Sequence, residues 1–66
     1  MYQYAIGLLK LNAETYPDSF IIYDGLGEAY MLKGDKESAI ESFGKALKLN
    51  PKDTNAEDLL KKLNAK

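Results

Sequence analysis

The sequence predicts an all-α fold of about four helices joined by short loops. Two observations carry this prediction: apolar residues recur at helical spacing in four successive segments, and the breaks between segments contain residues that stop or cap helices. A chain of 66 residues has room for one small domain, which buries only roughly 60% of the surface that its unfolded state exposes. We therefore expect one domain over residues 1–66, with marginal stability.

The first two helices are separated by a short segment around a proline. The first helix is expected over about residues 2–15, because the ring of Pro17 disfavours a helical conformation of the residue before it. Asp18 or Ser19 can then accept hydrogen bonds from the free backbone N–H groups of the next helix. That second helix is expected over about residues 20–33.

The third helix follows at once. Gly34 suits the left-handed conformation that commonly closes a helix, and Asp35 can cap a third helix that reaches about Leu49. Asn50 and Pro51 end that helix, because proline cannot continue it. The second and third helices are thus expected to form a tight pair.

A capping box predicts the start of the fourth helix. In the segment Thr54-x-x-Glu57, the hydroxyl and the carboxylate can each satisfy a backbone donor. The helix is expected to reach about Asn64. Its lysines alongside three leucines are typical of a helix with one apolar and one polar face.

Apolar and small residues indicate how the second and third helices pack. Gly27, Ala39 and Ala46 are small residues within these two helices. Gly25 and Gly44 also lie inside helices, and each should cost about 1 kcal/mol relative to alanine. The apolar stripe expected around the small residues consists of Tyr23, Leu26, Tyr30, Phe43, Leu47 and Leu49.

Composition excludes several classes of function. The chain has neither cysteine nor histidine, so the usual nucleophile and base pairs are missing, and we expect no catalysis, metal or cofactor. Nine lysines and ten acidic residues give a net charge of −1. The chain therefore lacks the excess of positive charge that binding to nucleic acid or to an anionic membrane surface requires. Paired carboxylates, Asp24 with Glu28 and Glu37 with Glu41, are expected on solvated helix surface. A soluble chain or fragment is expected, with the cytoplasm as the default location.

The order and spacing of the apolar and small residues resemble one tetratricopeptide repeat (TPR). The matching positions are Tyr23-x-x-Leu26-Gly27-x-x-Tyr30, then Ala39-x-x-x-Phe43, Ala46 and Pro51, with Tyr23 in place of the usual tryptophan. This resemblance implies antiparallel helix-turn-helix packing. It also implies that two helices approach too closely for larger side chains at Gly27, Ala39 and Ala46, a role that Gly25 and Gly44 do not have. It divides the chain into the second helix of a truncated repeat at 1–16, a full repeat at 20–53 and a capping helix at 54–66.

The TPR resemblance also implies a protein or peptide partner on a concave groove. A clamp for a C-terminal carboxylate is not expected, because Asp24 and Glu28 occupy two diagnostic positions. A peptide with Lys or Arg and one or two apolar anchors is favoured instead. Carried over by position, the groove residues are Ile21, Asp24, Glu28, Met31, Asn55, Asp58 and Lys62.

Three interpretations remain open, and the first two are non-catalytic protein interaction scaffolds. The favoured one is self-association into a dimer, because the first helix is apolar on nearly all sides and lacks a partner on one of them. The alternative is a monomeric peptide-binding adaptor. Residues 16–40 also resemble repeats appended to some bacterial serine hydrolases, so an excised tail of a larger hydrolase is a third possibility. The self-association residues are expected to be Tyr2, Ala5, Ile6 and Leu9.

Overall fold

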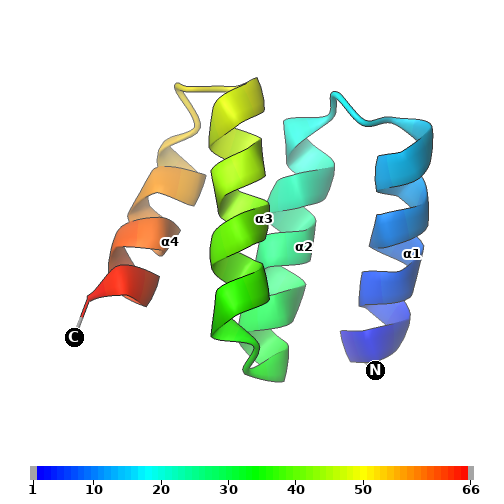
Figure 1. Ribbon diagram of the computed structural model, residues 1–66, viewed down its shortest axis with the longest axis horizontal. Coiled ribbons are helices and arrows are strands. Elements are labelled where there is room, and N and C mark those ends of the chain that lie inside the picture. The colour runs from blue at the N-terminus through cyan, green and yellow to red at the C-terminus, as the bar shows by residue number, and fades with distance from the viewer. Residues whose placement is uncertain (1, 66) are drawn as a thin grey trace.

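The computed structural model describes the backbone of residues 2–65 and the side chains of residues 3–65. It contains four helices, α1 (Tyr2–Thr15), α2 (Phe20–Lys33), α3 (Lys36–Leu49) and α4 (Thr54–Asn64), and no strand within the described residues. Successive helices run in opposite directions and lie side by side (Figure 1). The all-α fold and the four segments predicted from the sequence are therefore confirmed.

The hairpin between α2 and α3 forms for the reasons that the sequence indicates. Gly34 closes α2 in the left-handed conformation, with φ 92°. Its N–H donates to the carbonyl oxygen of Met31 at 3.1 Å. The N–H of Asp35 donates to the carbonyl oxygen of Tyr30 at 2.9 Å. Asp35 then caps the start of α3, since its carboxylate accepts from the Ser38 N–H at 3.2 Å and from the Ser38 hydroxyl at 2.8 Å. These bonds satisfy groups at both helix ends and fix the turn.

Two predicted side-chain caps are wrong. Ser19 stands at the start of α2, but its side chain makes no capping hydrogen bond. Asp53, not Thr54, caps α4, because its carboxylate accepts from the Ala56 N–H at 3.1 Å. A carboxylate is favoured over a hydroxyl there by the positive end of the helix dipole. Thr54 thus becomes the first helical residue, and Glu57 instead forms an ion pair with Lys61 at 3.1 Å.

The core consists of two adjoining clusters. In the larger one, Ala39, Phe43, Ala46 and Ala56 have no exposed surface, and Phe43 is the only large side chain among them. The smaller cluster contains Ile6, Leu26 and Ala29. Half-buried residues pack around both clusters, and Tyr23 and Tyr30 contact each of them. The close approach expected at Ala39 and Ala46 is therefore real.

Leu49 departs from the expected apolar stripe. It is the last residue of α3 and is exposed, whereas Leu47 packs against the larger cluster. Its position at the end of the helix places it beyond the contact with α2 and α4. The other members of the stripe are buried or half-buried as expected.

The order of packing follows the order of the chain. The main contacts are α1 on α2, α2 on α3 and α3 on α4. Helix α1 therefore has one covered side and α3 has two (Figure 1). Within the described residues, no helix combines the length and the hydropathy that crossing a membrane requires.

Candidate functional site

A shallow apolar pocket of about 290 Å³ lies between α2 and α4. Its lining residues are Glu28, Met31 and Leu32 from α2 and Leu59 from α4. Glu28 and Met31 are among the predicted groove residues. Leu32 and Leu59 are not, because their role depends on how α2 and α4 are placed relative to each other, which the sequence pattern does not specify. The structure thus brings two of the seven predicted groove residues into one pocket.

The other predicted groove residues lie outside this pocket. Ile21 is exposed on the first turn of α2, and Asn55, Asp58 and Lys62 are exposed on α4. None of these four lines the pocket. Their part in peptide binding stays a prediction.

Asp24 lies in a different environment from the solvated surface expected for it. Its Oδ1 atom is buried and receives no hydrogen bond from the described residues, and the same is true of Oδ2 of Asp53. The two carboxyl groups meet within hydrogen-bonding range, one from α2 and one from the residue that caps α4. We call these two residues the acid pair. Sequence analysis missed Asp53, although its place just before α4 could have marked it as a second acid at the groove.

Burial is the largest cause of a raised pKa at Asp24. The pKa rises from an ordinary 3.8 to about 7, with further contributions from the hydrogen bond and charge of Asp53 and from the charge of Glu28. The Asp53 carboxylate also accepts from the Ala56 N–H at the start of α4. The raised pKa assigns the proton between the two carboxyl groups to Asp24.

This proton predicts an unusual dependence of stability on pH. Between about pH 4 and pH 7 the folded chain holds a proton on Asp24 that the unfolded chain has lost, so the contribution of Asp24 to stability falls as the pH rises. Asp24→Asn should remove this dependence, because its amide can donate to Asp53 at any pH. We expect the variant to melt a few degrees above wild type at pH 8 and close to it at pH 5, since 1 kcal/mol corresponds to about 4–8 °C in a domain of this size.

Thermal melts followed by circular dichroism would measure this difference. Asp18→Asn is the matched control, because Asp18 is an exposed acid in the α1–α2 loop and should keep the wild-type dependence on pH. A wild-type chain and an Asp24→Asn variant with parallel profiles would contradict the shared proton.

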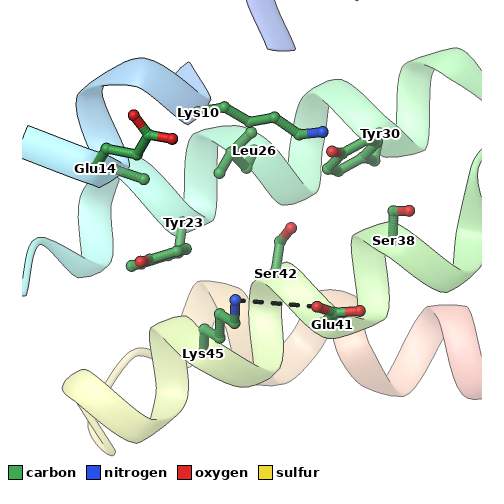
Figure 2. Close-up of a pocket in the computed structure, with 10 residues that line it drawn as sticks. Lys10, Glu14, Tyr23, Leu26, Tyr30, Ser38, Glu41, Ser42 and Lys45 are labelled. Atoms are coloured by element: carbon green, nitrogen blue, oxygen red, sulfur yellow. Dashed lines mark ion pairs between the residues drawn. The ribbon is translucent and has the colours of Figure 1, made fainter. Parts of the chain in front are cut away.

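A second, larger pocket of about 450 Å³ lies between α1 and α3, over α2 (Figure 2). Tyr23, Leu26 and Tyr30 lie along α2 between the side chains of the other two helices. The Nζ atom of Lys10 lies 5.9 Å from the ring centre of Tyr30, and that of Lys45 lies 5.7 Å from the ring centre of Tyr23. Lys45 also pairs with Glu41 at 3.9 Å. Both lysines already have partners within the chain, so we assign this pocket no ligand.

Helix α1 presents apolar side chains on the side away from α2. Tyr4, Leu8 and Leu11 are 76%, 51% and 62% exposed and share one face at i, i+4 and i+7 spacing. We call these three residues the outer face of α1. No charged residue belongs to it, because Lys10 and Glu14 line the pocket toward α3.

The residues predicted for self-association lie elsewhere on α1. Ile6 is buried against Leu26 and Ala29, and Leu9 packs against the same cluster. Ala5 is exposed beside the outer face, and the side chain of Tyr2 lies outside the described part of the structure. An exposed apolar face of α1 was thus expected correctly, but Ile6 and Leu9 belong to the face that contacts α2.

Comparison with known protein families identifies α2 and α3 as one repeat unit. A family model of the tetratricopeptide repeat matches residues 20–53, which include α2, α3 and the loop that ends at the cap of α4. A comparison with curated proteins found no match. The assignment of residues 1–16 to a truncated repeat and of residues 54–66 to a capping helix stays a prediction. With more than half of its residues in one intact repeat, the chain belongs to the tetratricopeptide repeat family.

Proposed function

We propose that this protein-interaction module associates with a second copy of itself through the outer face of α1. Membership of the tetratricopeptide repeat family indicates a role in protein–protein interaction, and such repeats are typically non-catalytic scaffolds. The observation that carries the finer proposal is the high exposure of Tyr4, Leu8 and Leu11 on one helix face. Contiguous exposed apolar surface usually marks a contact with another molecule.

The charge of the outer face supports a second copy as the occupant. In a two-fold symmetric contact, each patch packs on an identical patch, so a charged face would repel itself. The outer face carries no charge, whereas the charged side chains of α1 lie toward α3. The outer face is thus compatible with its own copy without any rearrangement.

The contact between two outer faces is small, so we expect a low affinity between the two copies. A helix of 14 residues is about 21 Å long, and three side chains along it bury far less than a standard interface. We therefore expect a weak dimer with a dissociation constant of roughly micromolar or higher. Assembly of this kind depends on concentration and adds stability only at the higher concentrations.

A double variant, Leu8→Lys with Leu11→Lys, tests the proposal. Lysine keeps the helix propensity of α1 and places like charges on both copies at the centre of the contact. In light scattering coupled to size-exclusion chromatography, over about a hundredfold range of concentration, wild type should shift from monomer to dimer while the variant stays monomeric.

Ile21→Lys is the matched control for the double variant. Ile21 is also an exposed apolar residue, but it lies on α2 away from the outer face, so this variant should dimerise like wild type. Circular dichroism should show equal helix content in all three chains. A wild-type chain that stays monomeric, or a folded double variant that still dimerises, would refute self-association through α1.

A further inference from the structure

The acid pair lies where α4 joins the rest of the fold. Asp53 is the cap of α4, and its Oδ1 atom accepts from the Ala56 N–H at 3.1 Å. Its Oδ2 atom and Oδ1 of Asp24 on α2 are buried and receive no hydrogen bond from the described residues. Asp53 is only 7% exposed, so water has little access to its carboxylate. The acid pair therefore connects the cap of α4 directly to α2.

One proton decides whether this contact attracts or repels. With the proton on Asp24, one carboxyl group can donate a hydrogen bond to the other. Without it, two carboxylates meet with no donor between them, and like charges shielded from water repel each other. The charged groups that act on Asp24 are Asp53 and, from its own helix, Glu28, and none comes from α1 or α3 among the described residues. No lysine offsets the repulsion, because the ion pairs of the described residues lie within α3 and within α4.

Helix α4 is the element that can respond to this repulsion. It is the shortest of the four helices, with 11 residues, and it packs mainly on α3. Its only buried residue is Ala56, whereas Leu59, Leu60 and Leu63 are half-buried against the larger cluster. A terminal element with one main interface opens at a lower free energy than the whole chain. Figure 1 shows α4 at one edge of the row of helices, where it can move away without displacing another helix.

We propose that the proton shared by the acid pair controls whether α4 is packed on the rest of the fold. With the proton in place, Asp53 stays against Asp24 and α4 stays docked on α3. When the proton leaves, the two carboxylates separate and α4 detaches with its cap, while α1, α2 and α3 stay folded. Detachment uncovers the side of the larger cluster that α4 covers in the docked state. The outer face of α1 takes no part, so this switch is independent of self-association.

The switch operates near neutral pH. In the docked state, burial first and then Asp53 and Glu28 raise the pKa of Asp24 from 3.8 to about 7. In the detached state Asp24 loses Asp53 and gains water, so its pKa returns toward the ordinary value. The proton thus favours docking fully below about pH 4, and this preference is lost as the pH rises through about 7. Because Asp24 is only half-buried, solvent weakens the effect, and we expect the ratio of detached to docked molecules to rise about tenfold or more between pH 5 and pH 8.

Distances between two spin labels would measure detachment directly. The chain contains no cysteine, so labels attach only at the introduced sites Lys36→Cys and Lys62→Cys, which replace exposed residues at the start of α3 and near the end of α4. These two helix ends lie at the same end of the antiparallel pair (Figure 1). In double electron–electron resonance, the distances should be narrowly distributed at pH 5. At pH 8 we expect a broad component, with the ratio of detached to docked molecules about tenfold larger or more.

A second label pair and two variants are the controls. Labels at Asn12→Cys and Lys36→Cys report on α1 and α3, and their distances should stay narrowly distributed at both pH values. Asp24→Asn should keep α4 docked at pH 5 and pH 8, because its amide can donate to Asp53 without a titrating proton. Asp18→Asn, in the α1–α2 loop, should respond to pH like wild type.

Three results would each overturn the proposal. The first is an α3–α4 distance distribution that is the same at pH 5 and pH 8. The second is a broadening of both label pairs together, because the whole fold would then loosen rather than α4 alone. The third is a folded Asp24→Asn variant that keeps the wild-type response to pH. The first two comparisons use the wild-type Asp24, so they decide the matter even if the variant does not fold.

Discussion

Phe43→Ala is expected to unfold a large part of the population at 25 °C. Among the described residues, Phe43 is the only large side chain with no exposed surface, and it packs among Ala39, Ala46 and Ala56. Truncation of a buried phenylalanine costs about 3–5 kcal/mol. At about 0.05–0.15 kcal/mol per residue, a chain of 66 residues has only roughly 3–10 kcal/mol of stability. Far-ultraviolet circular dichroism should show a large loss of helix, and urea should complete unfolding at a much lower concentration.

Leu49→Ala is the matched control on the same helix. Leu49 is exposed at the end of α3, so its truncation should change the free energy of unfolding by about 0.5 kcal/mol or less. The pair of variants separates the loss of a core side chain from a general weakening of α3. Equal effects at Phe43 and Leu49 would mean that the core does not depend on the Phe43 ring.

Gly27→Ala is the second variant with a large expected effect. It should lower the stability of the fold, whereas replacing glycine by alanine inside a helix usually raises it. A Cβ atom at Gly27 would lie 2.6 Å from Cε1 and Cζ of Phe43. Alanine normally stabilises a helix interior by about 1 kcal/mol over glycine. Here the methyl group must displace a fully buried ring, and overpacking of this kind costs about 1–3 kcal/mol. Urea unfolding should therefore show a net loss of stability.

Gly44→Ala supplies the contrast. Apart from its chain neighbours and the nearby backbone of α3, no heavy atom of the described residues lies within 4 Å of a Cβ atom placed on Gly44, so alanine should stabilise α3 by about 0.5–1 kcal/mol. A double-mutant cycle of Gly27→Ala and Phe43→Leu tests the contact between the two residues. The double variant should lose less free energy of unfolding than the sum of the losses in the two single variants. Strict additivity, or stabilisation by Gly27→Ala alone, would contradict the steric role of Gly27.

The glycines also show where the sequence is informative and where it is not. The repeat pattern identified Gly27 as a required small residue, and the ring of Phe43 is the reason. For Gly25 the nearest side-chain atom is Cδ2 of Leu9, 3.4 Å from a built Cβ, and for Gly44 there is open space. Neither position requires glycine for close packing, which agrees with the failure of the pattern to explain them.

The helix boundaries were predictable because local chemistry determines them. Pro17, Gly34 and Pro51 act on their immediate neighbours, so the sequence contains all that is needed to place the breaks. The cap of α4 was predicted wrongly as Thr54, because Asp53 and Thr54 are adjacent and both can accept a hydrogen bond. Only the path of the chain into α4 decides between them, in favour of Asp53.

The candidate sites were only partly predictable, because they depend on how separate helices are placed. Glu28 and Met31 could be assigned to the groove because the resemblance to a tetratricopeptide repeat carries these two positions over. Leu59 and Asp53 reach the same region from α4 and the loop before it, and this requires the packing of the helices. On α1, the pattern indicated an apolar surface on several sides but could not tell which residues face α2. That is why Ile6 and Leu9 were expected at the free surface.

The sequential packing of the helices also bears on how the chain folds. Because each helix packs mainly on its neighbours in the chain, most native contacts join residues that are close in sequence. Proteins of such low contact order search few long loops, and they typically fold in microseconds to milliseconds. The same arrangement makes the molecule behave as a short one-dimensional lattice. Fraying of α1 or α4 removes one helix interface, whereas opening of α3 removes two and with them the whole native state.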